Sequence, residues 1–292
     1  MEVIRLPFVK MQGAGNDYVY MDSIADIPFK NLPEKYYQQL AKKISDRHYG
    51  IGSDGLILIL PSANADFYMR VFNADGSEAQ MCGNGIRCVA KYVFERNLTD
   101  KKVLRIETPA GIKVINLKVS NGRVENIRVD MGSPLLEPGE IPVRGELESK
   151  FFSSTIKVGK KEFEFTAIGM GNPHCVVFVD ELSDRLIYEI GPLIENDPLF
   201  PERTNVEFVK ILTPDKIKMR VWERGSGETL ACGTGACASA VASFLNGYTE
   251  RKVEVNLLGG NLLIDYDRKD NHVYMTGGAE FIAEGEYFFN KD

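Results

Sequence analysis

Two short stretches of the chain share one pattern, a cysteine followed by glycine, one variable residue and a second glycine. Glycine lets the backbone approach a ligand closely because it has no side chain. Where a helix follows such a turn, its first N–H groups lack partners and carry partial positive charge, which favours a carboxylate and a thiolate. One motif can therefore hold an anionic group and supply a thiolate beside it. The two motifs read Met81-Cys82-Gly83-Asn84-Gly85 and Ala231-Cys232-Gly233-Thr234-Gly235.

Two thiols in equivalent settings suit the transfer of a proton from one face of a carbon atom to the other. One cysteine, as thiolate, removes the proton, and the other, as thiol, protonates the opposite face. A lone Cys-Gly turn is more often structural, but two copies inside a wider repeat favour catalysis. Neither copy has the ending or the spacing of a phosphate-binding loop. We therefore take Cys82 and Cys232 as the candidate catalytic residues.

The cysteine motifs lie inside an internal repeat. When residues 69–90 are laid on residues 219–240, eight of the twenty-two positions are identical without a gap. At the same offset Gly55 meets Asn205, and each precedes an apolar run. At a slightly different offset 13–16 resembles 169–172. The chain is therefore expected to form two related domains that present equivalent groups to one site.

The remaining cysteines and the histidines lack a comparable setting. Three further cysteines fall in apolar rows and are expected to be core thiols: Cys88, Cys175 and Cys237. The five cysteines include no CxxC pair, which argues against a disulfide framework or a Cys₄ zinc site. The three histidines are scattered without metal-ligand spacing, so no metal site is predicted: they are His48, His174 and His272.

The elements that must position these residues are mostly strands. Short apolar alternations separated by turn residues predict strands at 18–21, 56–60, 67–72, 103–107, 113–119, 124–131, 175–179, 253–257, 262–266 and 272–276. Helical patterns are fewer and cover 33–45, 87–97 and 236–246. Many strands with a few helices indicate an α/β or α+β class that is rich in antiparallel sheet.

Composition narrows the class of protein. The 292 residues favour about two domains, and 44% hydrophobic with 26% charged residues is ordinary for a soluble enzyme. A net charge of −6 argues against a nucleic-acid or anionic-membrane partner. No secretory signal is expected from residues 1–10, and the longest apolar run is too short to span a bilayer. We expect a cytoplasmic protein with reduced thiols.

Several longer stretches carry a resemblance to a known family. They are MQGAGNDYVYMD (11–22), RHYGIGSDG (47–55), FNADGSEAQMCGNGIRC (72–88), TPAG (108–111), MGNPHCVVFV (170–179), ERTNVEFV (202–209) and WERGSGETLACGTGACAS (222–239). In this order and spacing the chain resembles diaminopimelate epimerase almost from end to end. The resemblance implies a cofactor-independent and metal-independent epimerase that interconverts LL-diaminopimelate and meso-diaminopimelate, serves lysine biosynthesis and is commonly a homodimer.

The resemblance also implies roles for individual residues. Cys82 and Cys232 match the two catalytic cysteines, Cys82 being the base toward the LL-substrate. The helix-start positions that bind the reacting carboxylate match Gly83, Asn84, Gly233 and Thr234. The positions that hold the rest of the substrate match Asn16, Asn73, Asn172, Asn205, Glu223 and Arg224. His174 and Glu223 border the reacting centre. Gly55 stands where some members carry a glutamine, so no contact is assigned to it.

The implied fold has two similar domains, each a mostly antiparallel sheet wrapped around a central helix. The boundaries place 1–128 with 278–292 in the N-terminal domain, which carries Cys82. Residues 129–277 form the C-terminal domain, which carries Cys232.

Two other functions stay open at this point. A proline or hydroxyproline racemase would use the same two thiols, but its substrate lacks a distal amino-acid group and would leave Glu223 and Arg224 without a partner. A non-catalytic protein that binds a carboxylate or phosphate would need the helix termini without the thiols. A carboxylate and a guanidinium side by side suit the ammonium and carboxylate of a distal zwitterion.

Overall fold

The computed structural model describes residues 3–24, 33–137, 139–144 and 152–290. The chain divides into two compact units. Unit 1 comprises Met1–Val129 and Gly277–Asp292, and unit 2 comprises Asp130–Thr276. The C-terminal segment thus returns to the unit in which the chain began.

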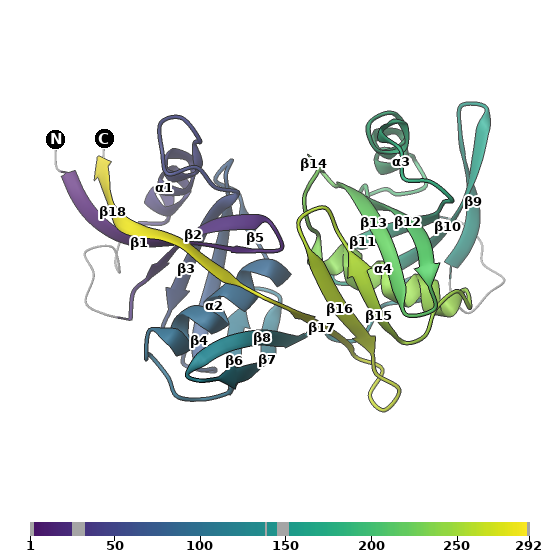
Figure 1. The fold of residues 1–292 in the computed structure, drawn as a ribbon. Helices are drawn as coiled ribbons and strands as arrows, with labels where there is room; N and C mark the ends of the chain where they lie inside the picture. The colour runs from purple at the N-terminus through teal and green to yellow at the C-terminus, as the bar shows by residue number, and fades with distance from the viewer. Residues whose placement is uncertain (1–2, 25–32, 138, 145–151, 291–292) are drawn as a thin grey trace. The chain divides into compact units, whose positions relative to one another are not determined.

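Unit 1 contains mostly strands and two helices, one early and one central (Figure 1). Its strands are β1 (Val3–Gly13), β2 (Asn16–Asp22), β3 (Gly55–Leu60), β4 (Phe67–Asn73), β5 (Glu78–Ala79), β6 (Val103–Thr108), β7 (Gly111–Ser120), β8 (Arg123–Asp130) and β18 (Glu280–Asn290). Its helices are α1 (Glu34–Ser45) and α2 (Gly83–Glu95).

Unit 2 repeats this order of elements. Its strands are β9 (Phe152–Val158), β10 (Lys161–Gly169), β11 (Pro173–Phe178), β12 (Asn205–Thr213), β13 (Lys216–Glu223), β14 (Gly227–Glu228), β15 (Lys252–Asn256), β16 (Asn261–Tyr266) and β17 (Val273–Gly277). A π-helical turn η1 (Leu186–Ile190) and α3 (Gly191–Glu195) take the place of α1, and α4 (Gly233–Leu245) takes the place of α2.

The two units have the same strand topology. In unit 1 neighbouring strands follow the order β18-β1-β2-β3-β4-β6-β7-β8. In unit 2 they follow the order β9-β10-β11-β12-β13-β15-β16-β17. The parallel pairs also correspond, β2–β3 with β11–β12 and β4–β6 with β13–β15. The predicted class, a mostly antiparallel mixed fold of two similar domains, is confirmed.

Each unit is built around one central helix. In unit 2, α4 contacts β10, β11, β12, β13, β15 and β16, so strands surround most of it. Its sequence GTGACASAVASFL is small and apolar nearly all round, which suits a helix buried on every side. In unit 1, α2 packs on β1, β2 and β7 and is buried over most of its length.

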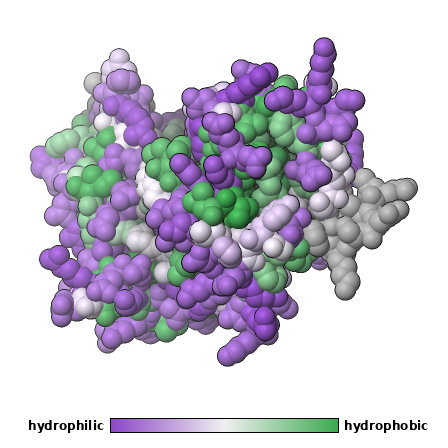
Figure 2. All heavy atoms as spheres, turned by 45° about the vertical axis from the view of Figure 1, so that its right-hand side comes forward, coloured by the Kyte–Doolittle hydropathy of each residue, from purple (hydrophilic) through white to green (hydrophobic). Residues whose placement is uncertain are grey.

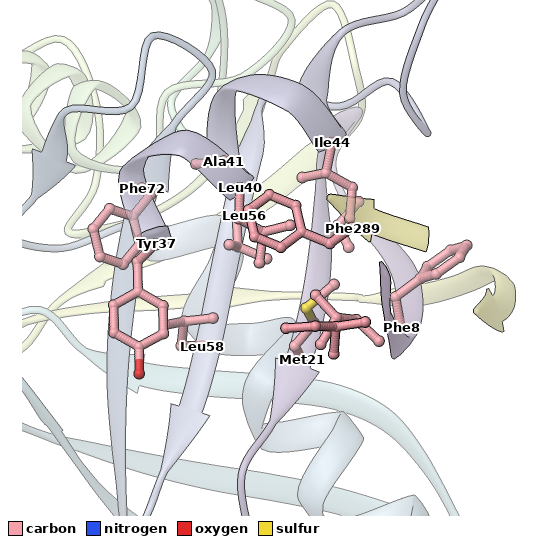
Figure 3. Close-up of a cluster of buried hydrophobic side chains, with 13 residues drawn as sticks. Phe8, Met21, Tyr37, Leu40, Ala41, Ile44, Leu56, Leu58, Phe72 and Phe289 are labelled. Carbon is pink, nitrogen blue, oxygen red and sulfur yellow. The ribbon is translucent and has the colours of Figure 1, made fainter. Parts of the chain in front are cut away.

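The second helix of unit 1 covers the other face of the strands. The predicted helix 33–45 is confirmed as α1, whose apolar stripe includes Tyr37, Leu40 and Ile44. This stripe packs on side chains of β1, β2, β3, β4 and β18 (Figure 3). Tyr37 stacks on Phe72 with ring centroids 6.1 Å apart. An equivalent cluster in unit 2 joins η1 and α3 to β10, β11 and β12.

The predicted central helices begin earlier in the structure than expected. Residues 87–97 and 236–246 were the predicted spans, whereas α2 begins at Gly83 and α4 at Gly233. Glycine-rich residues lower helix propensity, but a cysteine side chain caps each first turn and offsets this cost. The strand patterns noted in the sequence did not include β1. Pro7 lies in the part of β1 that pairs with β18.

A repeated ion-pair cluster holds the short strand before each cysteine motif. In unit 1, Arg70 on β4 binds Glu78 on β5 through both carboxylate oxygens and also binds Glu34. In unit 2 the same geometry recurs 150 residues later in Arg220, Glu228 and Asp184. Bidentate Arg–carboxylate pairs fix geometry as well as adding energy. The approach to each cysteine is therefore restrained in the same way.

Hydrophilic side chains cover most of the face drawn in Figure 2, with apolar side chains in smaller groups between them. Across the described ranges, none of the helices has the length and apolarity that crossing a membrane would require.

Gly55 provides a test of the packing between β3 and β4. A Cβ atom there would lie 2.1 Å from the backbone oxygen of Phe72 and 2.8 Å from the Tyr18 ring. Because backbone cannot yield as a side-chain end can, Gly55→Ala should lower the free energy of unfolding by about 3 kcal/mol. Denaturant unfolding measures this. Gly139→Ala, whose Cβ meets nothing within 4 Å, is the control and should change stability little. Equal stability of the two variants would contradict the packing.

Candidate active site

Cys82 is the N-cap residue of α2. Its backbone is extended (φ −134°, ψ 112°), and its sulfur accepts a hydrogen bond from the N–H of Gly85 at 3.3 Å. The thiol also donates toward Oδ1 of Asn16, with sulfur and oxygen 3.4 Å apart. Cys82 is half-buried. The sulfur therefore lies at the positive end of the helix with an amide oxygen beside it.

Cys232 caps α4 with nearly the same geometry. Its backbone is extended (φ −113°, ψ 113°), and its sulfur accepts from the N–H of Gly235 at 3.3 Å. The hydroxyl of Thr234 lies 3.5 Å from the sulfur. Unlike Cys82, Cys232 is buried, with only 5% of its surface exposed.

The electrostatic setting of Cys232 differs from the sequence-based expectation. A helix N-terminus favours the thiolate, but burial, followed by the negative charges of Glu223 and Glu207, raises the pKa of the Cys232 thiol well above its usual range. The N–H of Gly235 and the hydroxyl of Thr234 act in the opposite direction and are outweighed. Cys232 is therefore held as a protonated thiol, which is the form a proton donor needs.

Asn16 is held in one orientation by a carboxylate. Its Nδ2 donates to Oδ2 of Asp54 at 2.8 Å, which turns its Oδ1 toward Cys82. The same Asp54 oxygen accepts the N–H of Asp17 at 3.0 Å, and Arg47 binds both aspartates. Burial raises the pKa of Asp54 despite these donors. Asp54 is thus a residue that the sequence reasoning missed, although it lies beside Gly55.

The equivalent asparagine in unit 2 has a different partner. Oδ1 of Asn172 lies 2.9 Å from Nε2 of His174. Nδ1 of the same ring lies 2.7 Å from Oε1 of Glu207, and both side chains are fully buried. Glu207 was also missed from the sequence, where a charged residue inside the apolar strand 206–209 was its only signal.

The remaining candidates of unit 2 surround the end of β13. Glu223 accepts a hydrogen bond from the hydroxyl of Thr229, and burial raises the pKa of the Glu223 carboxyl. Asn205 donates to the backbone oxygen of Pro173 and accepts from the N–H of Arg224, both at 3.0 Å. Asn205 therefore ties β11, β12 and the turn after β13 together, whatever it also offers to a ligand.

The guanidinium of Arg224 donates to the backbone oxygen of Glu202 at 3.1 Å. Within the described ranges it forms no ion pair, which leaves its charge available to an anion. In unit 1, Nδ2 of Asn73 donates to Ser77 at 3.0 Å. The first-turn residues of both central helices lie as the motifs predict: Gly83, Asn84, Gly233 and Thr234.

Within each unit, hydrogen bonds and electrostatic interactions link only some of the predicted site residues to one another. In unit 1 a hydrogen bond joins Cys82 to Asn16, and Asn73 bonds to Ser77 instead. In unit 2, Cys232 lies near Glu223, whose charge affects its thiol. The ring of His174 has Asn172 and Glu207 as its hydrogen-bonding partners.

The other cysteines are fully buried, as expected for core thiols: Cys88, Cys175 and Cys237. Burial raises the pKa of Cys88 to about 11 and that of Cys175 well above its usual range. Neither is suited to act as a thiolate near neutral pH. In the part of the chain that the structure describes, no group of three or more His, Cys, Asp and Glu side chains could hold a metal ion.

Comparison with known sequences decides the family. The family profile described as Diaminopimelate epimerase matches residues 8–136 and 166–282. The chain belongs to the diaminopimelate epimerase family. The diaminopimelate epimerase of Acetivibrio thermocellus is 54% identical over 284 residues, which covers 97% of this chain and 99% of that one. That of Methanococcus maripaludis is 51% identical over 281 residues, covering 96% and 99%. The resemblance found in the motifs is confirmed.

Solved structures share the fold at much lower identity. A hydroxyproline epimerase from Agrobacterium vitis superposes with a TM-score of 0.71 at 16% identity, covering 97% of this chain and 92% of that one. A phenazine biosynthesis protein of the PhzF family from Bacillus anthracis gives 0.66 at 18% identity, covering 99% and 100%. These likenesses establish the fold alone, so the racemase alternative gains only distant support from them.

The orientation of Asn16 yields a prediction within the family. Asp54→Asn replaces a charged acceptor shared by two N–H donors, a change worth about 1.5–3 kcal/mol. If Asn16 binds substrate, epimerase kcat/KM should fall roughly tenfold or more while the protein stays folded. Asp66→Asn is the matched control, because Asp66 also binds a lysine and a backbone N–H in unit 1. A similar loss of activity in both variants would contradict a specific role for Asp54.

Proposed function

We propose that the protein is an amino-acid epimerase, an isomerase, which interconverts LL-diaminopimelate and meso-diaminopimelate with two cysteines and without pyridoxal phosphate. The observation that carries the proposal is the duplicated cap, in which Cys82 and Cys232 begin equivalent central helices with equivalent hydrogen bonds. Membership of the diaminopimelate epimerase family supports the substrate. Lysine biosynthesis follows from that function.

The reaction moves one proton. In the LL-to-meso direction a Cys82 thiolate takes the α-proton, and the Cys232 thiol protonates the opposite face of the same carbon. The raised pKa of the buried Cys232 thiol supports this assignment of roles. In the reverse direction the roles exchange, since the forward and reverse reactions follow the same path.

The first turns of α2 and α4 would stabilise the intermediate. The α-carboxylate gains negative charge as the carbanion forms, and the N–H groups at Gly83, Asn84, Gly233 and Thr234 provide fixed donors for it. Such preorganised donors are among the largest contributions to catalysis. Exclusion of water around the buried Cys232 would strengthen them.

The distal amino-acid group would distinguish the substrate from proline. We assign Glu223 to an ammonium and Arg224 to a carboxylate, with Asn16, Asn73, Asn172 and Asn205 as further contacts and His174 beside the reacting centre. Arg224 supports this, because its guanidinium carries no ion pair within the described ranges. A homodimer and a cytoplasmic location, where both thiols stay reduced, complete the proposal.

The central test removes each thiol in turn. Cys82→Ala and Cys232→Ala should each lower kcat by about 10³-fold or more, because a positioned acid or base contributes roughly 10²–10⁴. Cys88→Ala and Cys237→Ala are matched controls on the same two helices and should retain activity. The reaction is measured as the change in optical rotation of diaminopimelate, proline or hydroxyproline, each offered separately as substrate. Activity within tenfold of wild type in a folded Cys82→Ala or Cys232→Ala protein would reject the mechanism.

A second test concerns substrate choice. Arg224→Ala should reduce kcat/KM for diaminopimelate by roughly 30-fold or more, because removing a charged partner at a binding contact costs about 2–5 kcal/mol. Arg185→Ala, which removes an exposed helical ion pair of unit 2, is the control. Thermal unfolding should be similar in both variants. An unchanged kcat/KM would show that Arg224 is a surface charge.

A further inference from the structure

The two cysteine caps differ in the side chain beneath them. The second glycine of each motif packs against a strand so closely that no Cβ would fit. At Gly85 a Cβ would lie 2.5 Å from Cδ1 of Ile57 on β3. At Gly235 it would lie 2.7 Å from Oε1 of Glu207 on β12. The same place under the helix start holds a methyl group in unit 1 and a carboxylate in unit 2.

Ile57 and Glu207 are equivalent by sequence and by topology. They lie 150 residues apart, as do Cys82 and Cys232. Both are fully buried. A buried carboxylate costs free energy compared with a buried isoleucine, unless partners compensate for lost solvation. Since unit 1 shows that the fold accepts isoleucine here, packing alone does not require Glu207.

Glu207 is only partly satisfied by the residues around it. Its Oε1 binds Nδ1 of His174 at 2.7 Å, while its Oε2 has no hydrogen-bond partner among the described residues. His174 in turn contacts Asn172 at 2.9 Å. In unit 1 the position equivalent to His174 is Tyr18, reached by the same offset that relates Asn16 to Asn172. Unit 1 therefore has neither member of the buried pair.

On the basis of the two-cysteine function proposed above, we propose that Glu207 is a positioning residue that makes the two cysteines inequivalent. Its charge under the start of α4, together with its hold on His174, keeps the resting proton on Cys232. Cys82, which has Ile57 in the corresponding place, lacks this influence. The free enzyme then rests with a defined acid rather than with two interchangeable thiols.

The titratable groups that act on Cys232, or that bind one of these, come from three neighbouring strands. They are His174 on β11, Glu207 on β12 and Glu223 on β13. Burial is the largest cause of the raised pKa of Cys232, and the two carboxylates add to it. Glu223 is the proposed substrate contact, so its charge would be neutralised when an ammonium binds. Glu207 is buried beneath the helix and is not among the proposed substrate contacts.

The experiment measures protonation at each thiol directly. Intact wild-type protein and Glu207→Gln are alkylated with iodoacetamide between pH 6 and 10, and peptide mass mapping gives the rate at each cysteine. Glutamine keeps the size of the side chain and removes its charge. The alkylation profile of Cys232 should move to lower pH by about one unit or more, a tenfold or greater rise in rate near neutral pH. The profile of Cys82 should not change.

Two further variants secure the result. Glu207→Asp keeps the charge and should preserve the wild-type profile of Cys232. Glu207→Ile copies unit 1 and should shift the profile as glutamine does, so it serves if Glu207→Gln does not fold. Cys237 is buried on the same helix and serves as an internal control for local unfolding. Its alkylation would rise only if α4 lost its packing and became exposed to the reagent.

An unchanged Cys232 profile in folded Glu207→Gln or Glu207→Ile protein would overturn the proposal. So would an equal shift at Cys82, or a shift accompanied by alkylation of Cys237. The measurement requires no turnover, so it is independent of the cysteine substitutions that test the proposed function. Full activity in Cys82→Ala would reject the two-base mechanism whatever the Cys232 profile showed.

Discussion

Each central helix begins with a cysteine whose sulfur accepts the N–H of the residue three places along the chain, and the rest of the unit is arranged around that contact. The cap allows a glycine-rich segment to start a helix despite its low propensity. The second glycine then lets the helix start lie directly on a strand, with no space for a Cβ at Gly85 or Gly235. The sulfur atom, the backbone N–H groups of the first helical turn and the strand beneath them are thereby held in fixed positions. The proposed proton transfer on an anionic substrate needs such an arrangement.

The backbone folds of the two units correspond, but the side chains around their cysteine motifs differ. Strand order, parallel pairs, central helices and the arginine clusters of Arg70 and Arg220 correspond between the units. The two equivalent amides are anchored differently, Asn16 by Asp54 and Asn172 by His174. Inverting a carbon centre needs similar groups at similar depth, whereas a defined acid and base need different charges around them. A duplicated fold with altered side chains would meet both requirements of the proposed mechanism.

The carboxylates of unit 2 show which effect dominates at Cys232. The helix terminus and the hydroxyl of Thr234 favour the thiolate, yet burial and the charges of Glu207 and Glu223 outweigh them. Helix-end effects are typically below about 1 kcal/mol at exposed sites, whereas desolvation of a buried ion is several times larger. At Cys232, burial therefore overrides the lowered pKa that the motif alone predicts.

The sequence by itself determined the family, the fold class and the central helices. Short sequence patterns were sufficient for these predictions. The repeated Cys-Gly-x-Gly motifs and the apolar residues at every second position each reflect contacts between residues that are close along the chain. Apolar periodicity alone placed the starts of α2 and α4 too late, whereas the Cys-Gly motifs marked them correctly. The sequence did not determine the roles of Asp54 and Glu207, which lie 38 residues from Asn16 and 33 residues from His174 in the chain. Only the parallel pairing of β2 with β3 and of β11 with β12 brings these residues together, since such pairing joins segments that are separated by a helical crossover.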